Sequence, residues 1–358
     1  MQLRPHFRGA VTTATPAPYP ARWSEVPDPG KPMRSTRLTV LVLPALLAGL
    51  PGAAAAEGPR RPNGFALEPA GVDVAEILEG GPPRDGIPAL GDPAVVPARE
   101  AGLADDAPVL GVALGGEARA YPLSILAWHE LVNDRLGGEA ILVSYCPLCG
   151  TGMVFDRRVD GGVRTFGVSG LLYRSDLLLY DRETESLWSQ ILARAVIGPS
   201  LGERLRLIRA PVTTFGRWRR AHPGTTVLSF ETGHRRNYER NPYGDYALSE
   251  RLRFPAPTDD RYHPKMPTLG LRLADGSARA YPASEVHAAG GAVEEEFRGR
   301  RVRVAYDPEE QIFEFEAPDD VEVIEGFWFA WAAFHPETEV FVARGRPAPP
   351  AAAARAAD

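Results

Sequence analysis

An internal repeat limits the folds open to this 358-residue chain more than any other property of its sequence. The stretch Ala-Arg-Ala-Tyr-Pro occurs twice without change, at 118–122 and at 278–282. Three further blocks recur in the same order around it: 110–114 with 269–273, 141–145 with 302–306, and 218–223 with 331–336. Four matched blocks indicate an ancient duplication, with a first copy over about 109–229 and a second copy over about 268–342.

The repeat separates scaffold residues from residues that carry chemistry. Residues that both copies share are most simply structural. This group includes His222 and His335, each followed by a proline that stops a short helix. Residues that only the first copy has are better functional candidates. Cys146 and Cys149 are of this kind, because acidic residues stand at the matching positions of the second copy.

Apolar and β-branched runs predict many short strands and few helices. The strand candidates are 108–114, 140–145, 151–156, 163–168, 176–181, 186–190, 225–230, 269–273, 301–306, 311–316 and 339–343. The helix candidates are 122–133 and the tryptophan-containing stretches near 212–221 and 326–334. We therefore expect an α+β fold, mostly β, built as a pseudo-duplicated domain with short helices and long loops.

The chain divides into six segments by composition and motif content. They are an N-terminal extension with a signal peptide (1–56), an N-terminal extension that packs on the core (57–107), the first repeat with the cysteine motif and an insertion (108–230), a long polar loop (231–267), the second repeat without the cysteine motif (268–345) and a disordered tail (346–358). Loops as long as the fourth segment are often functional when they lie inside compact domains.

Residues 33–56 have the order of a secretory signal peptide. A basic stretch begins at Met33, an apolar run covers 38–50, and small residues lead to a cleavage site near Ala56. We take Met33 as the expected translation start. The apolar run is short for a bilayer span, and an N-terminal anchor helix is the alternative. We expect an exported protein, periplasmic or extracellular, with no membrane span after signal cleavage.

The charge balance argues against one class of partner. The chain has 40 basic and 46 acidic residues, a formal net charge of −6, and no basic run. Nucleic-acid binding needs concentrated positive charge, so no nucleic-acid partner is expected. The sequence also has no Gly-x-Ser-x-Gly, no phosphate-binding glycine loop and no His-Glu-x-x-His. Hydrolase functions are therefore unsupported, and no nucleotide cofactor is expected.

The only two cysteines of the chain lie in one motif, Tyr145-Cys-Pro-Leu-Cys-Gly150. A Cys-x-x-Cys pair serves as a metal knuckle, a redox-active dithiol or a structural disulfide. No histidine follows the second cysteine, which argues against covalent haem attachment. A strand-like run follows in place of the helix that lowers a thiol pKa in thioredoxin-type motifs. With its proline and glycine, the motif is similar to the cysteine knuckles of zinc-ribbon and rubredoxin-like sites. Those sites use two knuckles, whereas this chain has one.

A metal ion at this motif needs ligands from elsewhere in the chain. We expect His129, in Trp128-His-Glu130, to be a ligand of a zinc or copper ion, because it precedes the cysteine strand in the same copy. Further ligand candidates are His234, His263, Asp176 and, for Cu(I), Met153. A helix histidine packed beside a tryptophan is the structural alternative for His129.

Other polar side chains are expected around the cysteines. Glu130 and Asp176 are candidates for the contacts that orient metal ligands. Pocket candidates from the insertion of the first copy are Ser169, Tyr173, Ser175, Asp176, Trp188 and Gln190. The alternative is a hairpin whose polar residues face solvent, with Trp188 in the core. Side chains of the long loop that suit an anionic ligand are Arg235, Arg236, Tyr238 and Tyr243.

Five motifs together resemble one known family. They are Asp-Gly-Ile-Pro-Ala-Leu at 85–90, Trp-His-Glu at 128–130, Tyr-Cys-Pro-Leu-Cys-Gly-Thr at 145–151, Phe-Gly-Val-Ser-Gly-Leu-Leu-Tyr at 166–173 and Ser-Leu-Trp-Ser-Gln at 186–190. Their ordered combination is similar to the prokaryotic domain-of-unknown-function family numbered 3179, over about residues 70–345. The resemblance implies export, which is common among members, and brings no established reaction, substrate or cofactor.

Three functions are compatible with these patterns. The leading one is an exported protein that binds a zinc or copper ion through Cys146, Cys149 and His129. The alternatives are a thiol–disulfide oxidoreductase that uses the same cysteine pair, and a non-enzymatic binding module with a structural disulfide. The expected partners are a small molecule or metal ion and another exported redox or metal-handling protein. The sequence leaves open whether the protein is an enzyme.

Overall fold

The computed structural model describes residues 61–345, which fold mostly into β-strands with a few short helices. This content confirms the expectation of a mostly β fold. The predicted signal peptide and the predicted tail at 346–358 lie outside the described residues. Within 61–345, no helix has the length and apolar character needed to cross a membrane.

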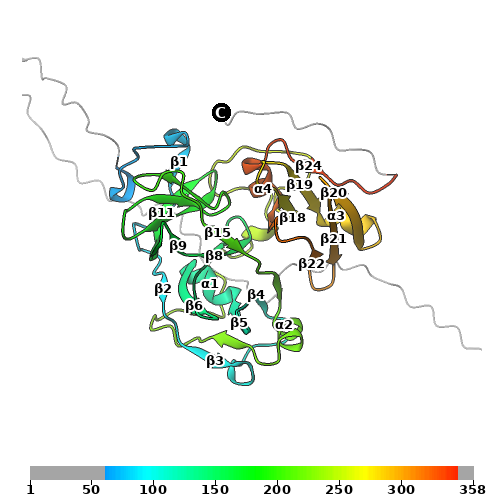
Figure 1. Cartoon of the computed structure of the whole chain (residues 1–358), viewed down its shortest axis with the longest axis horizontal. Coiled ribbons are helices and arrows are strands. Elements are labelled where there is room, and N and C mark those ends of the chain that lie inside the picture. Colours follow the sequence, from blue (N-terminus) through cyan, green and yellow to red (C-terminus); the bar gives the residue numbers. More distant parts are fainter. Residues whose placement is uncertain (1–60, 346–358) are drawn as a thin grey trace, which may run out of the picture.

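Five sheets of three or more strands form a propeller-like arrangement (Figure 1). In spatial order, their strands are β1 (Ile77–Glu79), β11 (Phe166–Tyr173), β12 (Asp176–Asp181), β13 (Leu187–Ser189) and β14 (Arg194–Ile197) in the first sheet; β15 (Arg206–Ile208), β8 (Thr151–Asp156), β7 (Glu139–Cys146), β6 (Leu131–Leu136) and β2 (Leu90–Gly91) in the second; β16 (Val212–Thr214), β4 (Pro108–Leu114), β5 (Glu117–Pro122), β17 (Thr226–Leu228) and β3 (Val95–Pro97) in the third; β23 (Glu322–Phe327), β18 (Pro267–Arg272), β19 (Ala278–Pro282) and β24 (Glu339–Val340) in the fourth; and β20 (Ala292–Phe297), β21 (Arg300–Asp307) and β22 (Ile312–Glu316) in the fifth.

Short elements connect these sheets. The remaining strands form a small hairpin of β9 (Arg158–Val159) and β10 (Gly162–Val163). The helices are α1 (Leu123–His129), α2 (Phe215–Ala221), α3 (Ala283–Ala288) and α4 (Trp328–Phe334), with single 3-10 turns at η1 (Pro62–Gly64), η2 (Val74–Glu76), η3 (Ala98–Glu100) and η4 (Tyr246–Leu248).

The expected pseudo-duplicated domain is wrong as a description of this architecture. The insertion between the matched sequence blocks does not form a loop on a two-part domain. It supplies β11 to β14, which make up a sheet as large as its neighbours. The described chain is therefore organised as five sheets rather than as two equal halves.

The segment before the first matched block supplies edge strands to three different sheets. β1 pairs with β11, β2 with β6 and β3 with β17. Phe65 and Leu67 of the same segment are buried in a hydrophobic cluster with the first sheet. These strands cover sheet edges whose backbone groups would otherwise be open to pairing with other chains.

The largest hydrophobic core lies where several sheets converge. It joins Cys146 and Cys149 to Phe155, Trp188 and Trp328, all of which are buried. These side chains come from the second and first sheets and from α4. The cysteine motif therefore lies inside the molecule and not in an exposed knuckle.

The same type of packing contact, a tryptophan over a glycine, occurs once in the third sheet and once in the fourth. The indole of Trp218 lies over Gly111 of β4, and the indole of Trp331 lies over Gly270 of β18. Each indole N–H donates to a threonine hydroxyl seven residues later in the chain, at distances of 2.9 and 3.0 Å. Only glycine leaves room for an indole this close to a strand.

The histidines that follow these two helices have structural positions. His222 follows α2 and packs against Trp218 at a tilt of 38°, with ring centroids 4.0 Å apart. His335 follows α4 and stacks on Trp331, with ring centroids 3.9 Å apart. Both are at the helix ends that the His-Pro motifs predict.

Two element predictions need correction. The stretch 122–133 is not one helix, because α1 ends at His129 and 131–136 form β6. Glu130 adopts a positive φ of 58°, which ends the helix, and Leu131 then pairs with Ser144 of β7. The candidate strand 163–168 is displaced, because β11 covers Phe166–Tyr173.

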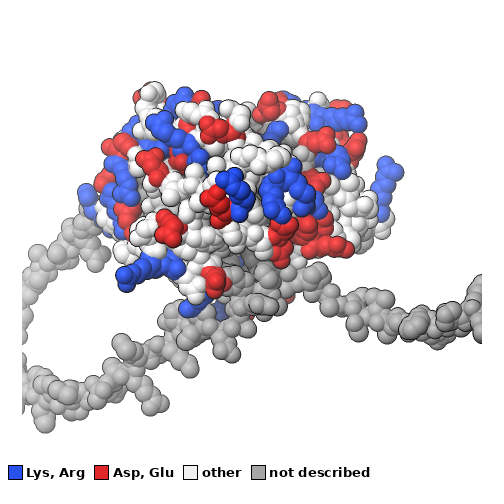
Figure 2. Space-filling view, turned by 90° about the horizontal axis from the view of Figure 1, so that it is seen from below, with Lys and Arg blue, Asp and Glu red and all other residues white. Residues whose placement is uncertain are grey.

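Basic and acidic side chains are interspersed over the face shown in Figure 2. Ion pairs such as Arg300 with Asp320 and Arg279 with Glu339 connect charges of opposite sign on neighbouring segments. Such a mixed surface has no extended field of one sign on this face.

We predict that Gly111→Ala destabilises the protein, because the added Cβ would overlap the six-membered ring of Trp218. The expected loss is about 1–3 kcal/mol, typical of overpacked cores. Gly224→Ala is the matched control, since nothing lies within 4 Å of its added Cβ, and its effect should stay within about 0.5 kcal/mol. Chemical denaturation measures both. Equal stability of the two variants would contradict the close contact.

Candidate functional site

The cysteine motif forms the tight connection between β7 and β8. Cys146 is the last residue of β7 and pairs with Thr151, the first residue of β8. The Cys149 backbone N–H donates to the Cys146 carbonyl at 3.1 Å, and Gly150 turns the chain with a φ of 64°. A left-handed φ of this kind favours glycine. Both thiols are free and buried.

A second tight turn brings Asp176 to this connection. Arg174 and Ser175 join β11 to β12, and both have a positive φ, of 52° and 67°. Two-residue hairpins of this geometry normally use asparagine and glycine, so the backbone is strained here. The Ser175 carbonyl accepts a hydrogen bond from Cys149 Sγ at 3.4 Å. The strained turn thus packs directly against the cysteine turn.

Cys146, Cys149 and Asp176 form the candidate metal group. One sulfur from each cysteine and one carboxylate oxygen lie within 4.8 Å of one another. Oδ2 of Asp176 accepts from the Ile191 backbone N–H at 3.2 Å, whereas Oδ1 is buried with no hydrogen-bond partner. Buried polar atoms are rarely left unpaired, so this oxygen beside two thiols is a place for a donor, a water or an ion. Among residues 61–345, it is the one group of three or more histidine, cysteine or acidic side chains arranged to hold a metal ion.

Burial controls the protonation of the group. It raises the pKa of Asp176 to about 7, because the charged carboxylate loses its hydration. Burial also raises the pKa of both thiols, and the nearby Asp176 raises them further. All three groups therefore hold their protons more tightly than they would in water.

Lys265 brings a positive charge to the group. Its side chain is buried, and no carboxylate of the described residues pairs with it within 4.0 Å. Nζ donates to the Arg251 carbonyl at 3.3 Å and lies 4.0 Å from the Tyr246 ring centroid. Burial lowers the Lys265 pKa to about 8, against the effect of Cys149, whose thiolate would favour the charged ammonium.

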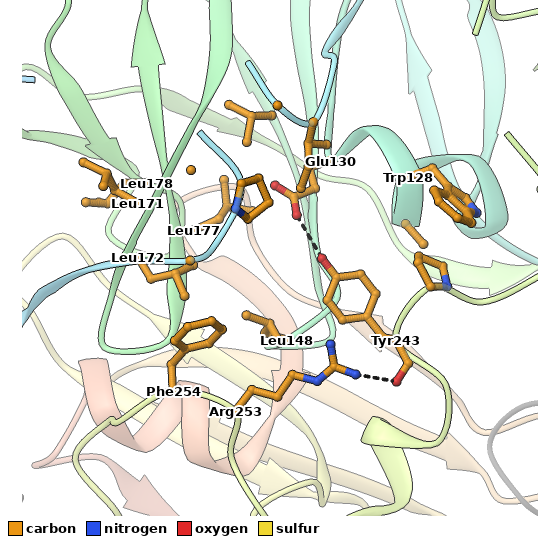
Figure 3. Close-up of a pocket in the computed structure, with 18 of the residues that line it drawn as sticks. Trp128, Glu130, Leu148, Leu171, Leu172, Leu177, Leu178, Tyr243, Arg253 and Phe254 are labelled. Carbon is orange, nitrogen blue, oxygen red and sulfur yellow. Dashed lines mark hydrogen bonds between the residues drawn. The ribbon is translucent and has the colours of Figure 1, made fainter. Parts of the chain in front are cut away.

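Glu130 closes one side of a neighbouring cavity of about 410 Å³ (Figure 3). Its Oε1 accepts a hydrogen bond from the Tyr243 hydroxyl at 3.1 Å. Burial raises the Glu130 pKa to about 7. Leu148, between the two cysteines in the chain, also lines this cavity. The cavity and the metal group therefore share the cysteine turn.

The structure does not bring His129, the ligand expected from the sequence, together with Cys146 and Cys149. This histidine is fully buried but lies outside the metal group, and both ring nitrogens have partners. Nδ1 lies 2.7 Å from the Pro88 carbonyl and must donate to it, so Nε2 accepts from the Tyr238 hydroxyl, also at 2.7 Å. Burial lowers the His129 pKa to about 4, which keeps the ring neutral. Asp176 takes the third place in the group.

The other ligand candidates also lie outside the group. His234 packs beside His129, with ring centroids 5.2 Å apart. Nδ1 of His263 accepts from the Lys265 backbone N–H. Met153 is buried in β8 within the hydrophobic core.

The pocket candidates of the insertion are buried, so the alternative of a solvent-facing hairpin is wrong. The Ser169 hydroxyl donates to the Leu178 carbonyl at 2.5 Å. Tyr173 packs edge-on against Phe334. None of the polar candidates in this hairpin lines the cavity, whose walls the hairpin supplies with leucines instead.

Trp188 and Gln190 support the site from β13 and the residues after it. The Trp188 indole lies in the core and donates to Oδ2 of Asp181 at 2.8 Å. Nε2 of Gln190 donates to the Ser144 hydroxyl and to the Thr151 carbonyl, which follows the cysteine turn. Trp188 is therefore a core residue, while Gln190 holds the start of β8 in place.

Sequence analysis missed Lys265, although a signal was present. The chain has two lysines among its 40 basic residues, and Lys265 is the one outside the N-terminal extension. A lysine in a chain that otherwise uses arginine suits a buried place where the wider guanidinium has no room.

A protein-family model with the description "Protein of unknown function (DUF3179)" matches residues 84–320. The chain therefore belongs to this family, as the motif resemblance predicts. Comparisons with curated proteins and with solved structures gave no match.

We predict that the free energy of unfolding of the metal-free, reduced protein falls as pH rises. The Glu130 pKa goes from about 4.5 in the unfolded chain to about 7 in the folded one, so stability is lost across that interval. One such group contributes a slope of up to about 1.4 kcal/mol per pH unit. Glu130→Gln should flatten the slope, whereas Glu117→Gln, at an exposed position, should not. Denaturant titrations at several pH values test this. An unchanged slope in Glu130→Gln would refute it.

Proposed function

We propose that this member of the family is a metal-binding protein that holds one divalent ion, zinc in the first place, through Cys146, Cys149 and Asp176. The observation that carries the proposal is the buried, unpartnered Oδ1 of Asp176 beside two free thiols. Thiolate sulfur and carboxylate oxygen are ligands that zinc accepts. Three protein ligands leave a fourth tetrahedral position for water or a substrate atom.

Charge favours a divalent ion over Cu(I). Two thiolates and one carboxylate bring three negative charges into the core. A divalent ion and the Lys265 ammonium bring three positive charges, so the buried group is neutral. With Cu(I) the same group keeps one uncompensated negative charge, which is costly in a buried site. Zinc therefore matches the charge of this group better than Cu(I) does.

The redox alternative has less support. Only the thiolate attacks a disulfide, and redox-active cysteines have a lowered pKa and partial exposure. Cys146 and Cys149 are buried, and burial raises the pKa of both thiols. A metal ion overcomes this barrier because it displaces the protons when it binds.

The matching positions of the second sequence copy support this assignment. Asp307 and Glu310 stand where the first copy has its cysteines, and both pair with Arg217. The second copy therefore has salt-bridge residues at the positions where the first copy has thiols. The cysteines belong to the first copy alone.

Export is part of the proposal and rests on residues 33–56. Oxidising compartments convert nearby thiols to disulfides. A bound metal ion protects a Cys-x-x-Cys pair there, because its sulfurs are already engaged. Another exported metal-handling or redox protein is the expected partner of such a site.

We predict that the reduced protein binds about one zinc ion per chain, measured by competition with a chromophoric chelator. Cys149→Ser and Asp176→Asn should each weaken binding by at least about 100-fold, because each removes a direct ligand. His129→Gln is the control, since both ring nitrogens are engaged elsewhere. The absence of zinc binding, or its loss in His129→Gln with the fold intact, would overturn the ligand set.

We also predict that zinc affinity rises with pH between about 6 and 8. Both thiols must lose their protons to bind, and so must Asp176, whose pKa is about 7. Calorimetry in buffers of different ionisation enthalpy measures the protons released. An affinity and a heat independent of pH and buffer would contradict binding through these groups.

A further inference from the structure

The cavity beside the cysteine turn has two chemically different sides (Figure 3). One side is apolar and comes mainly from the β11–β12 hairpin, with Phe254 of the long loop below it. Its main side chains are Val168, Leu171, Leu172, Leu177, Leu178 and Phe254. The other side presents Trp128, Glu130 and Tyr243. The volume of about 410 Å³ lies within the range of small-molecule sites, about 300–1,000 Å³.

Two arginines of the long loop line the same cavity. Arg236 and Arg253 are both exposed, which places them at its open side. Neither has a carboxylate within 4.0 Å among the described residues, although many arginines elsewhere in 61–345 form ion pairs. Two unpaired guanidinium groups at one opening are suited to an anionic group.

The orientation of both arginines is set by neighbouring aromatic rings. Arg253 donates from Nη2 to the Tyr243 carbonyl at 3.0 Å, and its guanidinium carbon lies 5.3 Å from the Tyr243 ring centroid. The guanidinium carbon of Arg236 lies 5.9 Å from the Trp128 ring centroid. Arg236 also donates from Nη1 to the Arg235 carbonyl at 3.1 Å. Each guanidinium thus uses one nitrogen for a backbone carbonyl, and its other N–H groups remain for a ligand.

We propose that this cavity binds a small organic anion with an apolar body. The apolar body lies against the leucines of the β11–β12 hairpin, and the anionic group lies at Arg236 and Arg253. Glu130 lies on the other side of the cavity and accepts a hydrogen bond from the Tyr243 hydroxyl. A carboxylate there disfavours a second anion, so the ligand binds with its anionic group toward the arginines. The proposal goes beyond metal binding, because none of the three proposed metal ligands lines the cavity.

Isothermal titration calorimetry with three probes of equal chain length tests the proposal on the full-length chain, with and without zinc. The probes are decanoate, decanol and decyltrimethylammonium, used below their aggregation concentrations. Decanoate should bind in both metal states. Decanol should bind about tenfold more weakly, and the cation should bind more weakly still. Added salt should weaken decanoate binding, because the arginines are exposed. Absence of decanoate binding, or tighter binding of decanol or the cation, would overturn the proposal.

Variants separate the cavity from other anion sites. The double variant Arg236→Ala, Arg253→Ala should weaken decanoate binding about tenfold and leave decanol binding unchanged. Arg235→Ala is the matched control, because this exposed neighbour in the same loop does not line the cavity. Ala127→Leu, which fills space from α1, should weaken both probes. An unchanged decanoate affinity in the double variant would refute the site.

The metal variants distinguish a failure of this proposal from a failure of the metal site. Cys149→Ser should lose zinc and keep decanoate binding, since the cavity is lined by other side chains. If the folded Cys149→Ser protein loses both, decanoate binds at the metal and not in the cavity, and the proposal is wrong. If the wild type binds decanoate but no zinc, the cavity proposal holds and the metal proposal fails.

Discussion

The burial of the Asp176 carboxyl group against two thiols sets requirements that the surrounding structure has to meet. An ionised carboxylate without hydration is costly, and one of its two oxygens has no hydrogen-bond donor. The Ile191 N–H offsets part of this cost by donating to the carboxylate. The rest of the cost appears as a raised pKa of Asp176, because burial favours its neutral form. Lys265 adds a cation that has no carboxylate partner of its own in the described chain. The proposed divalent ion would satisfy all of these groups at once.

The site is assembled from segments with very different backbone support. Paired strands position the proposed ligands: the β7–β8 ladder flanks the turn with Cys146 and Cys149, and Asp176 begins β12, which pairs with β11. Around Arg236 and Arg253, by contrast, the long loop forms no strand and makes isolated contacts: the Tyr243 hydroxyl donates to Glu130, and the Ser175 hydroxyl donates to the Phe254 carbonyl. The proposed metal ligands therefore stand on rigid elements, whereas the arginines of the cavity stand on a segment with little regular pairing. Rigid ligands with a more adaptable cover are typical of sites that admit a small molecule.

Local sequence patterns predict part of this structure well. The bounds of β4, β8 and β12 coincide with the expected strands, because each is a compact apolar run between polar turns. The pattern failed at 122–133, where apolar residues continue past the helix end and only the backbone of Glu130 separates α1 from β6. The cysteine pair and Asp176 were among the candidates. The place of His129 could not be predicted, because proximity in sequence does not show that Pro88 and Tyr238, from distant segments, contact its two ring nitrogens.

The three edge strands at the start of the described chain determine when the molecule can be completed. β1, β2 and β3 are synthesised first, yet their partners β11, β6 and β17 follow much later, and β17 ends at Leu228. Pairings between distant segments form slowly, because the loop between them must be closed first. The third sheet in particular lacks the partner of β3 until the chain has been synthesised as far as Leu228. Completion of the sheet edges is therefore among the later steps of folding.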